Sequence, residues 1–400
     1  MNENLYPLAF FFLKEAGNIF KNTVIKRVKI DKKFFTSNED DLIDLWHLSP
    51  KAAKIFIKNR DSALNMAEKE ISLIAKTQDV SVVSYYDRNY PPLLKEIPDS
   101  PVVLFVKGNR QALTENSIAV VGTRNATCYG TAQTQYIIDG LFNSKFTIVS
   151  GLAAGIDTSA HLAALKNNLK TVAVFGTGVD VVYPAENKKL AAQIIEKGGA
   201  LVSEMPFNTQ ALPFHFPRRN RIIAGISMAT VVVEASVKGG ALITAHLAQS
   251  YDRIVFAVPG RNDATLSVGC NYLIKDNKAI LIDSAKEILD NIKYNADCNI
   301  TGMSTIQNTL RNEKHTELLQ KELLILEIIE KEKPCSIDKI FDKSAMTVPE
   351  ILSIITKLEI AGFIKETAGS IYETLFPKQT QQYLHGVGSG TFTDIIGNNP

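Results

Sequence analysis

The sequence has few cysteines, almost no net charge and no long apolar run, and each of these absences excludes a class of protein. Its four cysteines lie far apart without a C-x-x-C spacing, which excludes a zinc or redox motif and fits a reducing cytoplasm. The apolar run Leu5 to Leu13 lacks a basic leader and is too short to span a bilayer. No repeat period is found. We therefore expect a cytoplasmic protein without a membrane segment.

The motifs of common cofactor-dependent enzymes are also missing. Gly176 and Gly178 are followed by Val181 where a G-x-G-x-x-G fingerprint needs its third glycine, and no Walker-type G-x-x-x-x-G-K-[ST] occurs. Gly225-Ile226-Ser227 does not complete a G-x-S-x-G motif, and no two histidines have the spacing of a metal pair. The sequence therefore predicts no cofactor, no metal site and no ATP hydrolysis.

The overall charge does not identify a partner, because 44 basic residues face 42 acidic ones. Only local clusters of charge can indicate nucleic acid. One cluster lies near the N-terminus, where basic residues outnumber Glu15 and Asp31. It is either a phosphate-facing surface or an ordinary solvated face. Its members are Lys14, Lys21, Lys26, Arg27, Lys29, Lys32 and Lys33.

The length predicts two or three domains. Residues 1–76 have apolar residues at helical spacing, with Ser49-Pro50 as a helix start, and predict a small helical domain. Residues 77–290 alternate apolar runs with segments long enough for crossover helices. Continuous apolar runs are typical of strands covered on both faces, so this region predicts a doubly wound, mostly parallel α/β sheet. The expected strands are 80–85, 102–106, 118–121, 146–149, 171–175, 200–203, 230–233 and 254–258.

The C-terminal part changes character again. Residues 291–318 are polar and predict a linker, and residues 377–400 predict a disordered tail. Between them, residues 319–376 predict three helices, at 322–329, 336–341 and 348–361, followed by a hairpin at 362–364 and 370–373. This is the order of a winged helix. The third helix carries Glu350 and Glu359 against Lys357 alone. Because a DNA-reading helix presents cations, this composition favours a protein-binding or regulatory role over duplex DNA readout.

Glycine-containing loops follow several of the expected strands. Gly122-Thr123-Arg124 follows the strand at 118–121, and segments 150–157 and 176–178 follow the next two. Lys238-Gly239-Gly240 opens a later helix. Open α/β sheets bind ligands at the carboxyl ends of their strands, where glycine allows close approach and helix N-termini favour anions. We expect Asp157 to cap its helix or contact a ligand, and Glu234 to hold an arginine or act as a catalytic carboxylate.

Three arginines lie close together in the stretch LPFHFPRRNRIIAGIS, residues 212–227. Its prolines place the basic group where an extended loop runs into a helix. Arg218, Arg219 and Arg221 cannot all face one way on a helix, so at least one is expected in a site and one in structure. Single-stranded nucleic acid needs such cations together with flat side chains for stacking, and Phe214, His215 and Phe216 can supply these.

Six blocks of the chain occur in order within residues 80–290: DRNYPPLL, GTRNATCYG, GLAAGIDTSAH, PRRNRIIAGIS, KGGALITAHLA and VFAVPG. Together they resemble the DNA-processing protein A family, also called DprA or Smf. The resemblance implies an extended Rossmann-like fold that binds and protects single-stranded DNA and loads the RecA recombinase during natural transformation. It also implies a homodimer, no catalytic activity and a C-terminal winged helix.

The same resemblance implies a DNA-binding pocket. Arg124 and Lys170 would contribute, together with the arginines of the PRRNR block and Phe214. Two departures from the family pattern are small: Thr123 stands where serine is frequent, and Lys238-Gly239-Gly240 stands where a Ser-Gly pair is common. The complete expected set is Gly122, Thr123, Arg124, Lys170, Phe214, Arg218, Arg219, Asn220, Arg221, Lys238, Gly239 and Gly240.

Two other interpretations stay open. The sheet edge with Glu234 and Gly239-Gly240 also looks like that of the lysine-decarboxylase-like nucleotide hydrolases, although their PGGxGTxxE block is absent. The basic N-terminal helices could instead be the main DNA contact.

Overall fold

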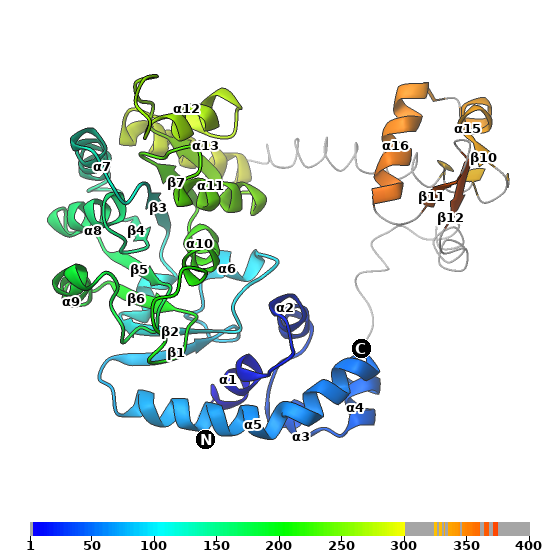
Figure 1. Ribbon diagram of the computed structural model, residues 1–400, viewed down its shortest axis with the longest axis horizontal. Coiled ribbons are helices and arrows are strands. Elements are labelled where there is room, and N and C mark those ends of the chain that lie inside the picture. The colour runs from blue at the N-terminus through cyan, green and yellow to red at the C-terminus, as the bar shows by residue number, and fades with distance from the viewer. Residues whose placement is uncertain are drawn as a thin grey trace. The chain divides into compact units, whose positions relative to one another are not determined.

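The computed structural model describes residues 3–300 and, beyond them, residues 324–325, 328–329, 332, 335–344, 346–360, 364–367 and 371–374. The chain divides into two compact units, residues 1–291 and 292–400 (Figure 1). Among the helices described, none is both long and apolar enough to cross a membrane.

The first unit is built on a nine-stranded sheet of order β1-β2-β6-β5-β4-β3-β7-β8-β9. The neighbouring strands from β6 to β9 are parallel, whereas β1 and β2 pair antiparallel at one edge. This confirms the mostly parallel sheet. The sequence missed β9, which is only two residues long. The strands are β1 Val80–Ser84, β2 Val103–Gly108, β3 Ser117–Val121, β4 Thr147–Ser150, β5 Thr171–Phe175, β6 Ala200–Ser203, β7 Ala229–Val232, β8 Ile254–Ala257 and β9 Ile280–Leu281.

Helices cover both faces of this sheet, as alternate residues of β5 show. Val172 and Val174 join a core with α10 and α11, whereas Ala173 and Phe175 join a core with α9. Both faces are therefore buried, which explains the continuous apolar runs. The helices are α6 Pro92–Glu96, α7 Cys128–Gly140, α8 Ile156–Lys166, α9 Lys188–Glu196, α10 His215–Ile226, α11 Gly240–Ser250, α12 Val268–Lys275 and α13 Ala285–Ile300, with the 3-10 turns η1 Arg110–Leu113 and η2 Ala185–Asn187.

The order of the strands creates a topological switch point between β3 and β7. From β3 the chain adds β4, β5 and β6 on one side, then crosses back to place β7 on the other side of β3. The loops that leave β3 and β7 therefore diverge. A crevice at the carboxyl ends of these two strands is where such sheets bind ligands.

The N-terminal helices pack against the antiparallel edge of the sheet. Ser49 accepts a hydrogen bond from Ala52 N (3.3 Å) and Pro50 opens α5, which confirms the expected helix start. Buried side chains of these helices share one core with Val82, Val103 and Phe105 of β1 and β2. Residues 1–76 thus belong to the same compact unit as the sheet. The helices are α1 Leu5–Phe12, α2 Asn18–Arg27, α3 Lys32–Thr36, α4 Glu39–Asp44 and α5 Pro50–Ala75.

The second unit contains α15 Ile337–Ser344, α16 Val348–Ile360 and a three-stranded sheet of order β10-β12-β11. The expected hairpin is present as β11 Ile364–Thr367 and β12 Ile371–Thr374, paired antiparallel. The sequence missed β10, Cys335–Ser336, where we expected the second helix to begin at Ser336. Ser336 instead pairs with Ile371 of β12.

The beginning of the expected linker is also different in the structure. Helix α13 continues through residues 291–300, because this polar stretch contains neither glycine nor proline to end it. Residues 301–318, the tail 377–400 and most of the expected helix at 322–329 lie outside the described residues.

Candidate nucleic-acid interface

A cavity of about 580 Å³ lies at the switch point, at the carboxyl ends of the parallel strands. The loops after β3, β4 and β7 line it, together with the first turns of α10 and α11. Gly122, Thr123, Arg124, Arg219, Asn220, Gly239 and Gly240, all expected in the site, line this cavity. The structure therefore brings together residues that are more than 110 positions apart in the sequence.

The loop after β3 is held close to its neighbours by glycine. A Cβ at Gly122 would overlap the Ile156 side chain, and one at Gly155, which has φ +80°, would overlap the backbone of Thr123 and Arg124. Thr123 N donates to Glu234 O (2.8 Å), which fixes this loop to the loop after β7. Only glycine permits this close approach. Arg124 follows on a fixed backbone with an exposed side chain.

Aromatic rings lie beside Arg124. Its guanidinium is 5.3 Å from the centroid of the Phe216 ring, a cation–π distance. The Phe216 ring packs on Tyr183 with centroids 5.5 Å apart, and Gly176 lies beneath it. In the segment between β5 and η2, Gly176 thus supports Phe216, and Tyr183 lines the cavity. Sequence reasoning missed Tyr183, because no local motif places it here.

Phe214 is the most exposed aromatic ring of this region, with 66% of its surface accessible. It is the N-cap residue of α10, and its ring packs edge-on against His215 with centroids 4.5 Å apart. The helix begins at His215, and Pro217 lies in its first turn, where proline is tolerated. Phe214 therefore stands at the helix entrance with a free ring surface.

Arg219 lines the cavity but is only 5% exposed. Its Nη1 donates to Gly151 O (2.6 Å) and to Val174 O, at the ends of β4 and β5. Burial lowers the pKa of Arg219 to about 10, against the favourable charge of the nearby Asp157. A Cβ at Gly151 would overlap this guanidinium. Arg219 therefore ties α10 to the sheet, with one edge at the cavity wall.

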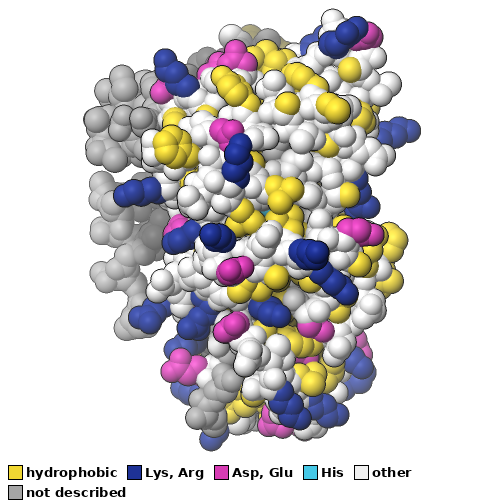
Figure 2. Space-filling view, turned by 90° about the vertical axis from the view of Figure 1, so that its left-hand side faces the viewer, with side chains coloured by type: hydrophobic (Ala, Val, Ile, Leu, Met, Phe, Trp, Pro, Cys, Tyr) yellow, Lys and Arg dark blue, Asp and Glu magenta, His cyan; other side chains and the backbone are white. Residues whose placement is uncertain are grey.

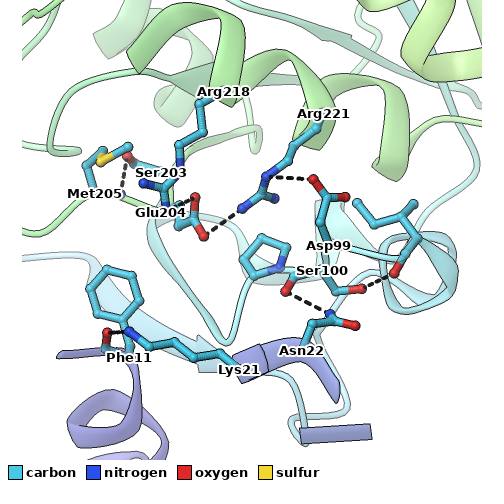
Figure 3. A network of polar contacts seen from close by, with 12 residues as sticks. Phe11, Lys21, Asn22, Asp99, Ser100, Ser203, Glu204, Met205, Arg218 and Arg221 are labelled. Atoms are coloured by element: carbon cyan, nitrogen blue, oxygen red, sulfur yellow. Dashed lines mark hydrogen bonds and ion pairs between the residues drawn. The ribbon is translucent and has the colours of Figure 1, made fainter. Parts of the chain in front are cut away.

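Arg221 and Arg218 point toward Glu204 (Figure 3), and neither is among the residues that line the cavity. Arg221, 4% exposed, binds Glu204 with Nη2–Oε1 2.7 Å and Asp99 with Nε–Oδ2 3.4 Å. The exposed Arg218 binds the other oxygen of Glu204, Nη2–Oε2 3.2 Å. The sequence could not separate these arginines from Arg219, because their partners lie on distant strands and loops.

The same buried network reaches the N-terminal helices. Asn22 Nδ2 donates to Ser100 O (3.1 Å), next to Asp99, and Lys21 Nζ donates to Phe11 O. Burial lowers the pKa of Lys21 to about 8, although the charge of Glu204 opposes this shift. Lys21, counted among the basic residues of the N-terminal surface, is therefore an interior residue.

Lys170 does not join the other expected site residues. It precedes β5, and its amine pairs with Glu115, which precedes β3. Parallel strands start at one edge and end at the other, so Lys170 lies at the edge opposite the cavity. Its place in the expected pocket is therefore wrong for this structure.

Two carboxylates have loop contacts that the sequence did not predict. Among the described residues Glu234 pairs with no arginine: its Oε2 accepts from Thr127 N (3.0 Å) and its Oε1 from Thr127 Oγ1 (2.5 Å), next to the start of α7. Asp157 does not cap α8. Its Oδ2 accepts from Gly151 N (3.1 Å) and Ala153 N (3.4 Å), and burial raises its pKa. Both carboxylates hold the loops in place.

The turn Lys238-Gly239-Gly240 opens α11 as expected, with Gly239 as N-cap. Asn220 Nδ2 approaches Gly240 O (3.4 Å) across the cavity, linking α10 to this turn. Lys238 is exposed beside it. A free helix N-terminus with a neighbouring lysine favours an anion.

On the face that Figure 2 shows, Lys and Arg side chains are scattered among Asp and Glu side chains, so this face presents no second basic surface for nucleic acid. No cluster of three or more His, Cys, Asp or Glu side chains suited to a metal occurs among the described residues. The first cavity is lined by arginine side chains, glycine-containing turns and aromatic rings.

A doubly wound sheet with such a switch point places the chain in the class of α/β proteins whose members bind ligands at this edge. Comparisons with known proteins identify the family. The family model of DNA recombination-mediator protein A matches residues 81–293, and that of the DprA winged helix domain matches residues 313–370. The chain belongs to the DprA/Smf family, as its motifs indicated.

Individual relatives agree. Protein Smf of Escherichia coli (strain K12) is 33% identical over 348 residues, which are 82% of this chain and 90% of that protein. DNA processing protein DprA of Streptococcus pneumoniae (strain ATCC BAA-255 / R6) is 46% identical over 211 residues, 53% of this chain and 74% of that protein. The X-ray structure of DprA from Streptococcus pneumoniae superposes with a TM-score of 0.59 at 38% identity, covering 72% of this chain and 97% of that one.

Proposed function

We propose that this chain binds single-stranded DNA at the switch-point cavity, protects incoming DNA and loads RecA onto it during natural transformation. The observation that carries the proposal is the exposed Arg124 beside the Phe216 ring at the cavity, in a chain of the DprA/Smf family. A cation and a flat ring are the two groups that a single strand needs for sequence-tolerant binding.

Each part of the cavity has a role in this proposal. Arg124 contacts a phosphate, and the N-terminus of α11 at Gly239-Gly240, with Lys238 nearby, receives a second one. Bases stack on exposed aromatic surface, of which Phe214 offers the most in this region. The buried Arg219 holds α10 against the strand ends, so the cavity does not collapse when it is empty.

The partners and the compartment rest on family membership more than on geometry. We propose RecA as the protein partner, a homodimer as the assembly and the cytoplasm as the location. The free thiols Cys128, Cys270 and Cys335 fit a reducing compartment. Assembly of RecA filaments on a single strand that this protein has already bound tests RecA as the partner. Filament assembly that the protein does not accelerate would contradict this part of the proposal.

We further propose that the chain binds without catalytic turnover. The candidate catalytic carboxylate of the enzyme interpretation, Glu234, is 2% exposed, and both of its oxygens accept hydrogen bonds from Thr127. A carboxylate engaged in this way stabilises the start of α7. Hydrolysis of any mononucleotide in a panel, abolished by Glu234→Gln, would favour the enzyme interpretation instead.

Binding is tested with a fluorescent oligo-dT and a matching duplex, titrated at several salt concentrations. We expect tighter binding to the single strand, because only unpaired bases can stack on side chains, and weaker binding as salt rises. Equal affinity for both would indicate phosphate contacts alone. Deletion of residues 1–76 is not a usable control here, because those helices share a core with the sheet.

A further inference from the structure

We propose that a second cavity beside the first one holds the base of the neighbouring nucleotide, so that the strand crosses the β3–α7 loop. This inference rests on the proposed function and extends it. The second cavity, of about 760 Å³, lies at the carboxyl ends of β7 and β8. Thr127, Tyr129, Glu234, Pro259 and Arg261 are among its lining residues.

The walls of the second cavity are fixed before any ligand binds. On one side, Glu234 and Thr127 are joined by two hydrogen bonds, and a Cβ at Gly130 would overlap the Glu234 carboxylate. On the other side, Asn271 clamps Gly260 by donating to its carbonyl (2.9 Å) and accepting from its N–H (3.1 Å). Ligand sites are usually preformed in this way.

Tyr129 supplies the flat surface. Its hydroxyl donates to Pro259 O (2.6 Å), which ties the start of α7 to the loop after β8. The side chain is nevertheless 43% exposed. A ring that is fixed at its hydroxyl and open along its surface can stack on a base with little loss of side-chain freedom.

The charges indicate which part of a nucleotide enters. Glu234 and Asp263 line the cavity against one cation, Arg261, whose guanidinium is already paired with Asp263 at 2.7 and 2.9 Å. This balance disfavours a phosphate and suits an uncharged base. A phosphate can instead pair with Arg124, which lies between the two cavities. In the β3–α7 loop, residues 121–124 line the first cavity, and Thr127 is the first residue that lines the second.

The two cavities therefore form one track, with a base in each and the linking phosphate at Arg124. The track follows the loop pair joined by the hydrogen bond from Thr123 N to Glu234 O (2.8 Å). A single strand has the required alternation of flat, uncharged bases and charged phosphates.

The test uses the full-length protein and fluorescent oligonucleotides of about 4 to 16 nucleotides. Tyr129→Ala should weaken binding about tenfold, because one stacked base is lost. Tyr129→Phe keeps the ring and should bind like wild type, although it loses the bond to Pro259. Ala264→Trp, which fills the cavity from the loop after β8, should weaken binding as Tyr129→Ala does.

A second measurement does not depend on variants. Photo-crosslinking of wild type with 5-iodouracil-containing strands should modify Tyr129 as well as the aromatic residues of the first cavity. Wild-type affinity in both Tyr129→Ala and Ala264→Trp, with no crosslink at Tyr129, would overturn the second cavity and leave the first intact. A wild-type protein that binds no single strand would overturn the proposed function and this inference together.

Discussion

The loop after β3 and the helix α10 both bring arginines to the same edge of the sheet, yet they use them in opposite ways. Arg124 on the loop is exposed and faces an aromatic ring. Arg219 and Arg221 on the helix are buried and bind carbonyls and carboxylates of the protein. The number of basic residues in a stretch therefore does not measure its capacity to bind DNA; burial decides.

Helical spacing explains the division within α10. Arg218 and Arg221 are three residues apart and lie on one side of the helix, where both reach Glu204. Arg219 is turned toward the ends of β4 and β5. Among the residues that the structure describes, Arg124 forms no ion pair with a carboxylate, and its exposed side chain stays available for an anionic ligand.

The largest effect is expected from Arg221→Met. This change leaves Glu204 buried with only Arg218 to compensate it, and removing one partner of a buried ion pair costs about 3–5 kcal/mol. Urea unfolding should show this loss of stability, whereas the matched control Arg124→Met should unfold like wild type. An Arg221→Met protein that is as stable as wild type but has lost DNA affinity would contradict this account, because Arg221 would then bind DNA and not stabilise the fold.

A smaller effect is expected from pH, through the buried His161 beside Arg219. Its Nδ1 contacts Thr171 Oγ1 (2.7 Å), and its Nε2 has no hydrogen-bond partner in the part of the chain that the structure describes. Burial, together with the Arg219 charge, lowers the pKa of His161 to about 3 from an ordinary 6.5. Below pH 6.5, His161 takes up a proton in the unfolded chain but stays neutral in the folded chain, so the free energy of unfolding falls as pH falls.

For this histidine alone, the free energy of unfolding should drop by about 2 kcal/mol between pH 7 and pH 5. Urea unfolding of wild type and His161→Gln at both pH values isolates it, because the variant lacks the imidazole. A difference between the two proteins that does not change with pH would mean that His161 has the same pKa in the folded and the unfolded chain, and that burial and Arg219 do not shift it.

Much of the fold could be predicted from the sequence, because the physics involved is local. Continuous apolar runs identified the strands from β1 to β8, and glycine turns located the loops at their carboxyl ends. Gly239 and Ser49-Pro50 begin helices as their types predict. The two-residue strands β9 and β10 are too short to leave a pattern.

The site was only partly predictable, because the fate of a charged residue depends on partners far away in the chain. Arg221 is buried by Glu204 and Asp99, and Lys170 is placed at the opposite edge by the strand that follows it. Tyr183, which supports Phe216, has no local motif. Motifs gave the residue types near the cavity, and only the fold separated the exposed cations from the buried ones.

The most direct test of this account compares single-strand binding of Arg124→Ala and Lys170→Ala across a salt titration, with urea unfolding of each protein. The account predicts that Arg124→Ala keeps its stability, binds about ten- to a hundredfold more weakly and loses about 0.7 from its salt slope for the lost phosphate contact. Lys170→Ala should bind like wild type, because its pair with Glu115 lies at the other edge. Unchanged binding in Arg124→Ala, or a loss confined to Lys170→Ala, would contradict the assignment of the DNA site to the switch-point cavity.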